Sequence, residues 1–339
     1  MKIHSIKFQI MIVITLLILF LITGSSYYIY NQTEDLLYQT LIKEAEKTTK
    51  QYTENITQWL EKNMNLINTL TEMNQVQGMN WLSSQIIFNR ILEETEMDAI
   101  MMVSTDGKYK TTAGEIGDIS DKAYFQEVIK NKRPVISKPY IDSFTGLRML
   151  VIAYPITDDY DKIVGVLGGI VQMSYIDELV DEIELNNSGY GWIINSNKTV
   201  ITHPDQETHD NKIDSMEDSQ YIEEVINFMV QGQEGKLNYI RNNTEYIALF
   251  SPIKYTDWSL AVTAETDNVL SSLSVLKKGI IYSALIAVII GLLATYFITI
   301  RISSPIISLT KFVKKISSGD LSTDINVDSI KLNNEIKTL

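Results

Sequence analysis

The chain has 339 residues, no cysteine and a formal net charge of −13 at pH 7. The lack of cysteine excludes disulfides, thiol nucleophiles and thiolate metal sites. The negative charge is concentrated in residues 31–278, which hold 38 of the 42 acidic residues but only 21 of the 29 basic ones. A region this acidic lacks the basic surface that nucleic-acid binding requires, so we expect no nucleic-acid partner.

Two uncharged hydrophobic runs, residues 8–30 and 279–300, are each long enough to span a bilayer as a helix, which takes about 20 residues. The first run could instead be a signal peptide, whose apolar core of about 7–15 residues precedes a small-residue cleavage site. Here the bulky residues Tyr27, Tyr28 and Tyr30 occupy that position, and they are typical of an aromatic belt at the membrane interface. We therefore expect two uncleaved transmembrane helices.

Basic residues set the expected orientation in the membrane. Lys2 and Lys7 precede the first hydrophobic run, and a basic stretch that begins at Arg301 follows the second. The positive-inside rule then places residues 1–7 and 301–339 in the cytoplasm, with the region between the two runs outside. The expected localisation is the cell membrane, crossed twice, with both termini cytoplasmic.

A single helix is predicted to continue from the first hydrophobic run through a stalk that ends near Met73. Apolar residues recur every three or four positions from Leu37 to Met73, as one helical face requires. No proline precedes Pro134 and no glycine lies between Gly24 and Gly78, so nothing in the sequence breaks this helix early.

The stalk is followed by a first module of mixed helices and strands. The expected elements are a helix at 81–92, a hairpin at 99–112 around Asp106-Gly107, strands at 148–155 and 162–171, and a helix at 175–183. Both strands after the hairpin are apolar at odd and even positions alike, which favours central strands covered on both faces. Gly165, Gly168 and Gly169 interrupt the second one, which suggests close approach by a ligand or another backbone.

A second, smaller copy of this pattern follows. Its expected elements are strands at 190–195 and 199–203, a helix at 221–229, and strands at 236–240, 246–252 and 258–263. Because hairpin, helix and strands recur in the same order, we interpret the region as a structural duplication with modules at 31–185 and 186–270. The fold class is α+β, with a long N-terminal helix and two antiparallel-sheet modules.

Beyond the second hydrophobic run, apolar residues repeat at alternating steps of four and three. They are Ile302, Ile306, Leu309, Val313 and Ile316. This heptad pattern predicts a coiled coil.

Two parts of the sequence carry a family resemblance. Asp121-Lys122-Ala123-Tyr124-Phe125, Ser137 to Asp142 and Thr145-Gly146 resemble the membrane-distal module of a double Cache sensor domain. Pro305, Gly319-Asp320-Leu321 and Asn334-Glu335-Ile336 resemble a HAMP linker, here residues 301–339. The resemblance implies that both modules are PAS-like and that the chain belongs to a homodimeric bacterial receptor.

In the amino-acid-binding subset of double Cache sensors, a basic residue, two aromatic residues and downstream polar groups hold the ligand. The positions that match are Lys122 as the base, Tyr124 and Phe125 as the walls, and Tyr140 with Asp142 downstream. Lysine replaces the usual arginine, and Gly169-Ile170 stands where a carboxylate for the amino group is expected. An amino acid, an organic acid or another polar metabolite therefore all stay open as ligand. The alternative is that Tyr124 and Phe125 are core residues and Lys122 is a surface cap.

No pattern indicates catalysis, a cofactor or a metal. His203 and His209 are near several carboxylates, but their spacing fits neither helical pairing nor a usual zinc loop. The sequence holds no G-x-S-x-G motif and no P-loop, so any catalytic output domain would lie beyond residue 339.

The resemblance implies a transmembrane receptor that binds a small extracellular ligand in its distal module. It would pass the signal through the second membrane helix and HAMP to cytoplasmic signalling proteins, as methyl-accepting chemotaxis proteins do. Two alternatives remain: the sensor part of a histidine kinase or diguanylate cyclase, and a membrane-tethered binding module without signalling.

Overall fold

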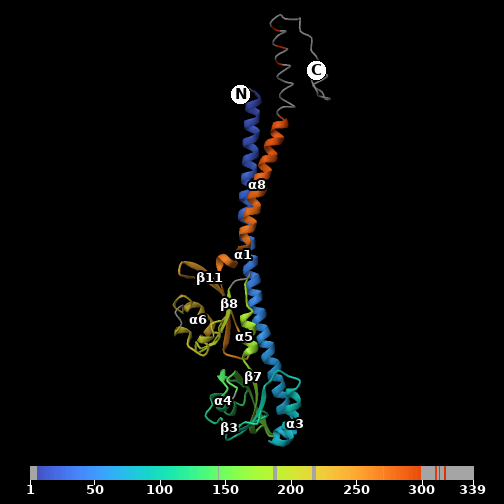
Figure 1. Ribbon diagram of the computed structural model, residues 1–339, viewed down its shortest axis with the longest axis vertical. Helices are drawn as coiled ribbons and strands as arrows, with labels where there is room; N and C mark the ends of the chain where they lie inside the picture. The colour runs from blue at the N-terminus through green and yellow to red at the C-terminus, as the bar shows by residue number, and fades with distance from the viewer. Residues whose placement is uncertain are drawn as a thin grey trace. The chain divides into compact units, whose positions relative to one another are not determined.

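The computed structural model describes residues 6–143, 145–185, 189–215, 219–269 and 271–298, together with positions 310, 313 and 317. The chain divides into two units, one formed by Thr40–Leu270 and the other by Met1–Gln39 with Ser271–Leu339 (Figure 1). Apart from the three isolated positions, the expected coiled coil and HAMP linker lie outside the described residues.

Helix α1 (Ile6–Thr71) is unbroken over 66 residues, which confirms the predicted continuous helix. Within the unit Thr40–Leu270, its buried residues follow the predicted three- and four-residue spacing; Ile56, Leu60 and Ile67 have no exposed surface. The apolar face of the stalk is therefore the face that packs on the sheets.

The other unit pairs the first part of α1 with α8 (Ser271–Ile298). Both helices contain a stretch long and apolar enough to cross a membrane. They approach closely at Gly291, where a Cβ atom would lie 2.8 Å from Ile18 Cγ2. A glycine at this position lets the two helices pack at short range, as small residues do between transmembrane helices.

The first module, which we call the distal module, begins with α2 (Asn74–Gln77) and α3 (Trp81–Leu92). Its sheet has the order β3-β2-β1-β7-β6-β4, and β5 also pairs with β6. The strands are β1 (Ala99–Ser104), β2 (Lys108–Thr111), β3 (Ile116–Asp118), β4 (Val135–Ile136), β5 (Tyr140–Ile141), β6 (Arg148–Thr157) and β7 (Ile163–Gln172). Strands β6 and β7 are central and largely buried, as predicted.

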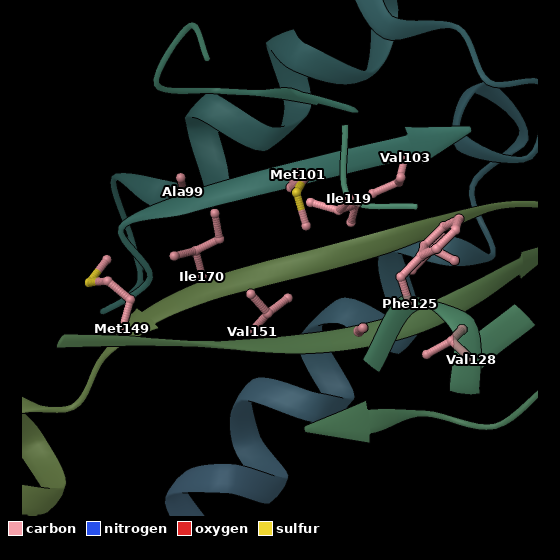
Figure 2. Packing of buried hydrophobic residues seen from close by; sticks show 11 residues of the cluster. Ala99, Met101, Val103, Ile119, Phe125, Val128, Met149, Val151 and Ile170 are labelled. Atoms are coloured by element: carbon pink, nitrogen blue, oxygen red, sulfur yellow. The ribbon is translucent and has the colours of Figure 1, made fainter. Parts of the chain in front are cut away.

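The two faces of the distal sheet pack against different helices. One face carries α4 (Ala123–Asn131) and a hydrophobic cluster that includes Met101, Phe125 and Val151 (Figure 2). The other face lies against α1, because a Cβ at Gly169 would be 2.8 Å from Ile67 Cδ1. The close approach expected at this glycine is thus made by a helix side chain.

The second module, the proximal module, repeats the strand order. Its sheet is β10-β11-β12-β8-β9, with a hairpin strand at one edge and the last strand beside the first, as in the distal module. Its elements are β8 (Tyr190–Asn195), β9 (Val200–Thr202), α6 (Glu223–Val230), β10 (Gly235–Arg241), β11 (Thr244–Pro252) and β12 (Trp258–Glu265). The order matches the predicted duplication.

Helix α5 (Ser174–Asp181) connects the modules, and Arg148 joins them at that point. Its Nη1 donates to both carboxylate oxygens of Asp177 on α5, at 3.3 and 3.1 Å. Its Nη2 donates to the backbone oxygen of Ile201 in β9 at 2.7 Å, and its Nε lies 3.6 Å from Asp210 Oδ2. One side chain from a distal strand therefore contacts three parts of the chain around the junction.

Candidate ligand-binding site

A cavity of about 930 Å³ opens in the distal module beside α4. It lies within the range of about 300–1,000 Å³ typical of small-molecule sites. Its wall is formed by strands β1 to β3, the start of α4, and the segment 134–143 that crosses the edge of β6.

The segment 134–143 is fixed by hydrogen bonds to β6. The backbone nitrogen of Ser137 donates to the Val151 oxygen at 2.8 Å, and the Ser137 hydroxyl accepts from the Val151 nitrogen at 2.8 Å. On either side of Ser137, β4 and β5 add short antiparallel pairings to β6. Residues of this segment are therefore held over the cavity by the sheet itself.

Asp142 ends that segment and organises the turn after it. Its Oδ2 accepts from the backbone nitrogen and from the hydroxyl of Thr145, both at 2.7 Å. Gly146, with φ +72°, closes the turn by donating its backbone N–H to the Asp142 oxygen at 2.8 Å. The Asp142 carboxylate is thus locked in orientation at the cavity wall.

The structure brings Lys122, Tyr124, Tyr140 and Asp142 together around the cavity. Lys122 stands at the N-cap position of α4, where its side chain is 56% exposed and its Nζ lies 3.9 Å from Asp121 Oδ2. Phe125 is placed differently: it is 4% exposed and packs in the core cluster beside the cavity (Figure 2).

Three tyrosines of the distal module contribute phenol rings to the wall: Tyr109, Tyr124 and Tyr140. Burial raises the pKa of Tyr124 above its usual range, with a smaller effect from Tyr140. Burial, followed by the nearby Asp142, raises the pKa of Tyr140 to about 12. All three rings therefore stay neutral at physiological pH and offer both a π-face and a hydroxyl.

Sequence reasoning missed Tyr109, Thr111 and Glu115, which also line the cavity. Tyr109 pairs with Val103 and Thr111 with Met101 across the β1–β2 hairpin. Alternate residues of a strand point to the same face, so the inward position of Tyr109 and Thr111 follows from the period of two. Nothing in the local pattern identified Glu115, which precedes the very short strand β3.

The cavity wall also includes residues of the proximal module, from its β8–β9 and β11–β12 turns; they are Asn197, Tyr255, Thr256, Asp257 and Trp258. Tyr255 has a left-handed backbone, with φ +68°, and its hydroxyl donates to Glu61 Oε1 of α1 at 3.2 Å. The Ser196 hydroxyl donates to Asp257 Oδ2 at 2.6 Å.

The two histidines considered as metal ligands bond to the backbone. His209 Nε2 lies 2.8 Å from the backbone oxygen of His203 and 3.1 Å from its backbone nitrogen, and the backbone nitrogen of Asp205 donates to His203 Nδ1 at 3.0 Å. Within the described parts of the chain, no three His, Asp or Glu side chains are grouped to hold a metal ion. Both histidine rings thus bind backbone atoms of their own loop.

The chain packs two antiparallel-sheet modules along one helix, and the first module contains a cavity of ligand size. This is the architecture of a tandem ligand-sensing domain. The chain belongs to the Cache domain family (dCache_1), whose profile matches residues 29–273.

The relatives found by sequence are methyl-accepting chemotaxis proteins. The chain is 26% identical to McpB of Bacillus subtilis over 218 residues, which are 62% of this chain and 30% of McpB. It is 22% identical to PctB of Pseudomonas aeruginosa over 345 residues, which are 96% of this chain and 52% of PctB. The chain thus spans about a third to a half of these relatives.

Solved structures share the fold. The ligand-binding domain of the Pseudomonas fluorescens chemoreceptor CtaA, in complex with L-isoleucine, has a TM-score of 0.57 at 16% identity. The match covers 71% of this chain and 98% of that domain.

Proposed function

We propose that this chain is the sensing part of a transmembrane receptor that detects a small extracellular molecule, with chemotaxis as the output. The observation that carries the proposal is the cavity in the distal module of a Cache sensor whose ends lead into two membrane-length apolar helices. Chemotaxis receptors among its relatives, and an L-isoleucine complex among its structural neighbours, support the same reading.

Four residues would contact the ligand: Lys122, Tyr124, Tyr140 and Asp142. All four line the cavity, and Asp142 is already oriented by Thr145. Phe125 would support Tyr124 from the core cluster, since it is buried beside it on α4. No cofactor and no catalytic step form part of this function.

The signal would leave through the proximal module. The β11–β12 turn lines the cavity, and β12 leads through α7 (Thr266–Val269) into α8. A ligand that moves this turn would therefore act on a strand continuous with the second apolar helix. In the membrane, residues 8–30 and 279–300 would be the spans, with both termini cytoplasmic, 31–278 outside, and a HAMP linker at 301–339. A homodimer would present paired α8 helices to cytoplasmic signalling partners.

Cysteine crosslinking tests the proposal, because the natural chain contains no cysteine. A Cβ at Gly291 would lie 3.9 Å from Ile18 Cβ, within the separation of about 3.5–4.5 Å that a disulfide requires. We expect the double variant Ile18→Cys/Gly291→Cys to crosslink in vesicles, and a cognate ligand to change the rate of crosslinking.

The control is Leu17→Cys/Gly291→Cys, because Leu17 is 59% exposed and neighbours Ile18 on the helix. It should crosslink poorly with or without ligand. An effector that binds the sensor yet leaves the crosslinking rate of the first pair unchanged would refute signalling through α8 and favour a tethered binding module.

A further inference from the structure

Acidic side chains outnumber basic ones on the cavity wall. Five carboxylates line the cavity, Glu115, Asp118, Glu127, Asp142 and Asp257. Only two ammonium groups, those of Lys122 and Lys138, do so within the described residues. Asp118, Glu127 and Asp257 are exposed and screened by solvent, whereas Glu115 and Asp142 are half-buried. An anionic ligand would therefore meet repulsion chiefly at Glu115 and Asp142.

The two lysines do little to reverse this balance. The Lys122 ammonium is near Asp121 and more than half exposed, so it is partly neutralised and faces water. Lys138 is exposed as well. A lysine also lacks the planar fork with which arginine holds a carboxylate through two parallel hydrogen bonds.

Glu115 is a carboxyl of the cavity wall that lies near Asp142. Burial raises the pKa of this carboxyl, and the nearby Asp142 raises it further. Within the part of the chain that the structure describes, no lysine, arginine or histidine lies within ion-pair distance of Glu115. Two neighbouring carboxylates that are half removed from water would be stabilised by a positive charge between them.

The tyrosines supply a second and independent feature. The phenol rings of Tyr109, Tyr124 and Tyr140 line the same cavity. Glu115 acts electrostatically on both Tyr109 and Tyr140, so these rings and the carboxylate share one region of the wall. Neutral aromatic faces attract ammonium groups, and quaternary ammonium ligands are recognised by such walls.

Resting on the proposed function, we propose that the distal cavity binds a cationic organic amine, with its charged nitrogen between Glu115, Asp142 and the tyrosine rings. The apolar part of the ligand would pack on Met101, Val151 and Ile170, which form the inner wall.

Matched probes test this inference on the full chain in nanodiscs, with thermal unfolding as the readout. One series keeps a 3-methylbutyl group and changes the charged group on its first carbon: 3-methylbutylamine is cationic, L-leucine zwitterionic and 4-methylpentanoate anionic. A second pair compares choline with its uncharged isostere 3,3-dimethylbutan-1-ol. We expect stabilisation by the two cations and none by the anion or the alcohol.

Substitutions in the cavity wall test where the amine binds. Glu115→Gln should weaken amine binding about tenfold, the loss expected for one charge-assisted contact. Asp159→Asn removes an equal charge from an exposed turn outside the cavity wall, and should leave the affinity unchanged. Tyr140→Leu, which keeps bulk and removes the π-face, provides a second test should Glu115→Gln fold poorly.

The outcomes separate the inference from the proposed function. Binding of L-leucine or 4-methylpentanoate with no response to either cation would overturn the cationic ligand and leave the receptor function standing. A cation effect that survives both Glu115→Gln and Tyr140→Leu would overturn the site. Absence of any thermal stabilisation by the cations, the zwitterion, the anion and the alcohol would count against both the inference and the receptor function.

Discussion

The two modules share one strand order but use the same face of the sheet in opposite ways. In the distal module, the row that crosses β6, β7 and β1 reads Ala153, Gly168 and Met101. In the proximal module, the corresponding row across β11, β12 and β8 reads Phe250, Ala261 and Trp192. Of the distal row only Met101 borders the cavity, whereas the two large aromatic side chains of the proximal row belong to a packed core cluster.

The helices that cover the two sheets, α6 and α4, differ in packing as well. Phe250 stacks on Phe228 of α6, with ring centroids 5.8 Å apart, and Trp192 donates its indole N–H to the Thr263 hydroxyl at 3.0 Å. Opposite the distal row, α4 presents Tyr124 toward a space of about 930 Å³. Two modules of the same strand order therefore differ in packing: one is filled like an ordinary core and the other keeps room for a ligand.

The largest expected effect is the loss of stability when the Trp192 ring is removed from the core of the proximal module. Trp192→Ala should destabilise the chain by about 3–5 kcal/mol, because it removes a buried ring and leaves the Thr263 hydroxyl without its donor. Denaturant unfolding of the full chain in detergent measures this. If the comparison holds, Met101→Ala in the distal row should cost clearly less, since Met101 already borders a cavity; equal losses would contradict it.

The comparison also requires the two modules to be joined firmly, and Arg148 makes that contact. Its side chain is 16% exposed and that of Asp177 25%, so the pair is mostly removed from water. Arg148→Met should destabilise the chain by about 2 kcal/mol, below the loss for a fully buried pair. It should also weaken the effect of an effector on Ile18–Gly291 crosslinking while leaving the effector's affinity nearly unchanged.

Lys132→Met is the matched control, because it breaks an ion pair with Asp161 that lies within the distal module, where the two side chains are 50% and 82% exposed. It should change both stability and crosslinking little. An Arg148→Met variant that signals normally would show that the junction is not part of the transmission path.

Making the residue row across β6, β7 and β1 more like the row across β11, β12 and β8 should weaken effector binding. Met101→Trp places the proximal aromatic residue at the corresponding strand position and would occupy part of the cavity. We expect effector affinity to fall at least about tenfold. Overpacking should destabilise the chain by no more than about 3 kcal/mol. Isothermal titration on the full chain measures the first effect and thermal unfolding the second. Unchanged affinity would place the ligand elsewhere.

Much of the fold was predictable because its long elements carry strong patterns. The apolar face of α1 and the double-sided burial of β6 and β7 were read directly from spacing. Strands β3, β4 and β5 were not expected, since two or three residues carry no period. They form because neighbouring strands and Ser137 supply their hydrogen bonds.

The site was predictable only in part for a similar reason. Tyr124 and Phe125 are adjacent on a helix, so their side chains point about 100° apart and cannot both face the cavity. The structure turns Tyr124 toward the cavity and Phe125 into the core. Glu115 reaches the wall because β3 pairs with β2 and Tyr109 lies over Gly117, a tertiary arrangement that no local pattern encodes.

The smallest expected effect concerns the polar loop of the proximal module, where His203 accepts the Asp205 N–H at Nδ1. Burial lowers the pKa of His203 below its usual 6.5, with Asp205 acting in the opposite direction and His209 in the same one; Tyr190 packs edge-on against its ring. Below pH 6.5 the unfolded chain therefore takes up a proton that the folded chain does not, so this stability is present above pH 6.5 and is lost as the pH falls toward the lowered pKa. His203→Gln should flatten that part of the stability profile between pH 7 and pH 5, measured by thermal unfolding. Asp205→Asn removes the charge that opposes the shift and should steepen the same part of the profile. An unaltered slope would mean that His203 does not contribute to the acid sensitivity of the chain.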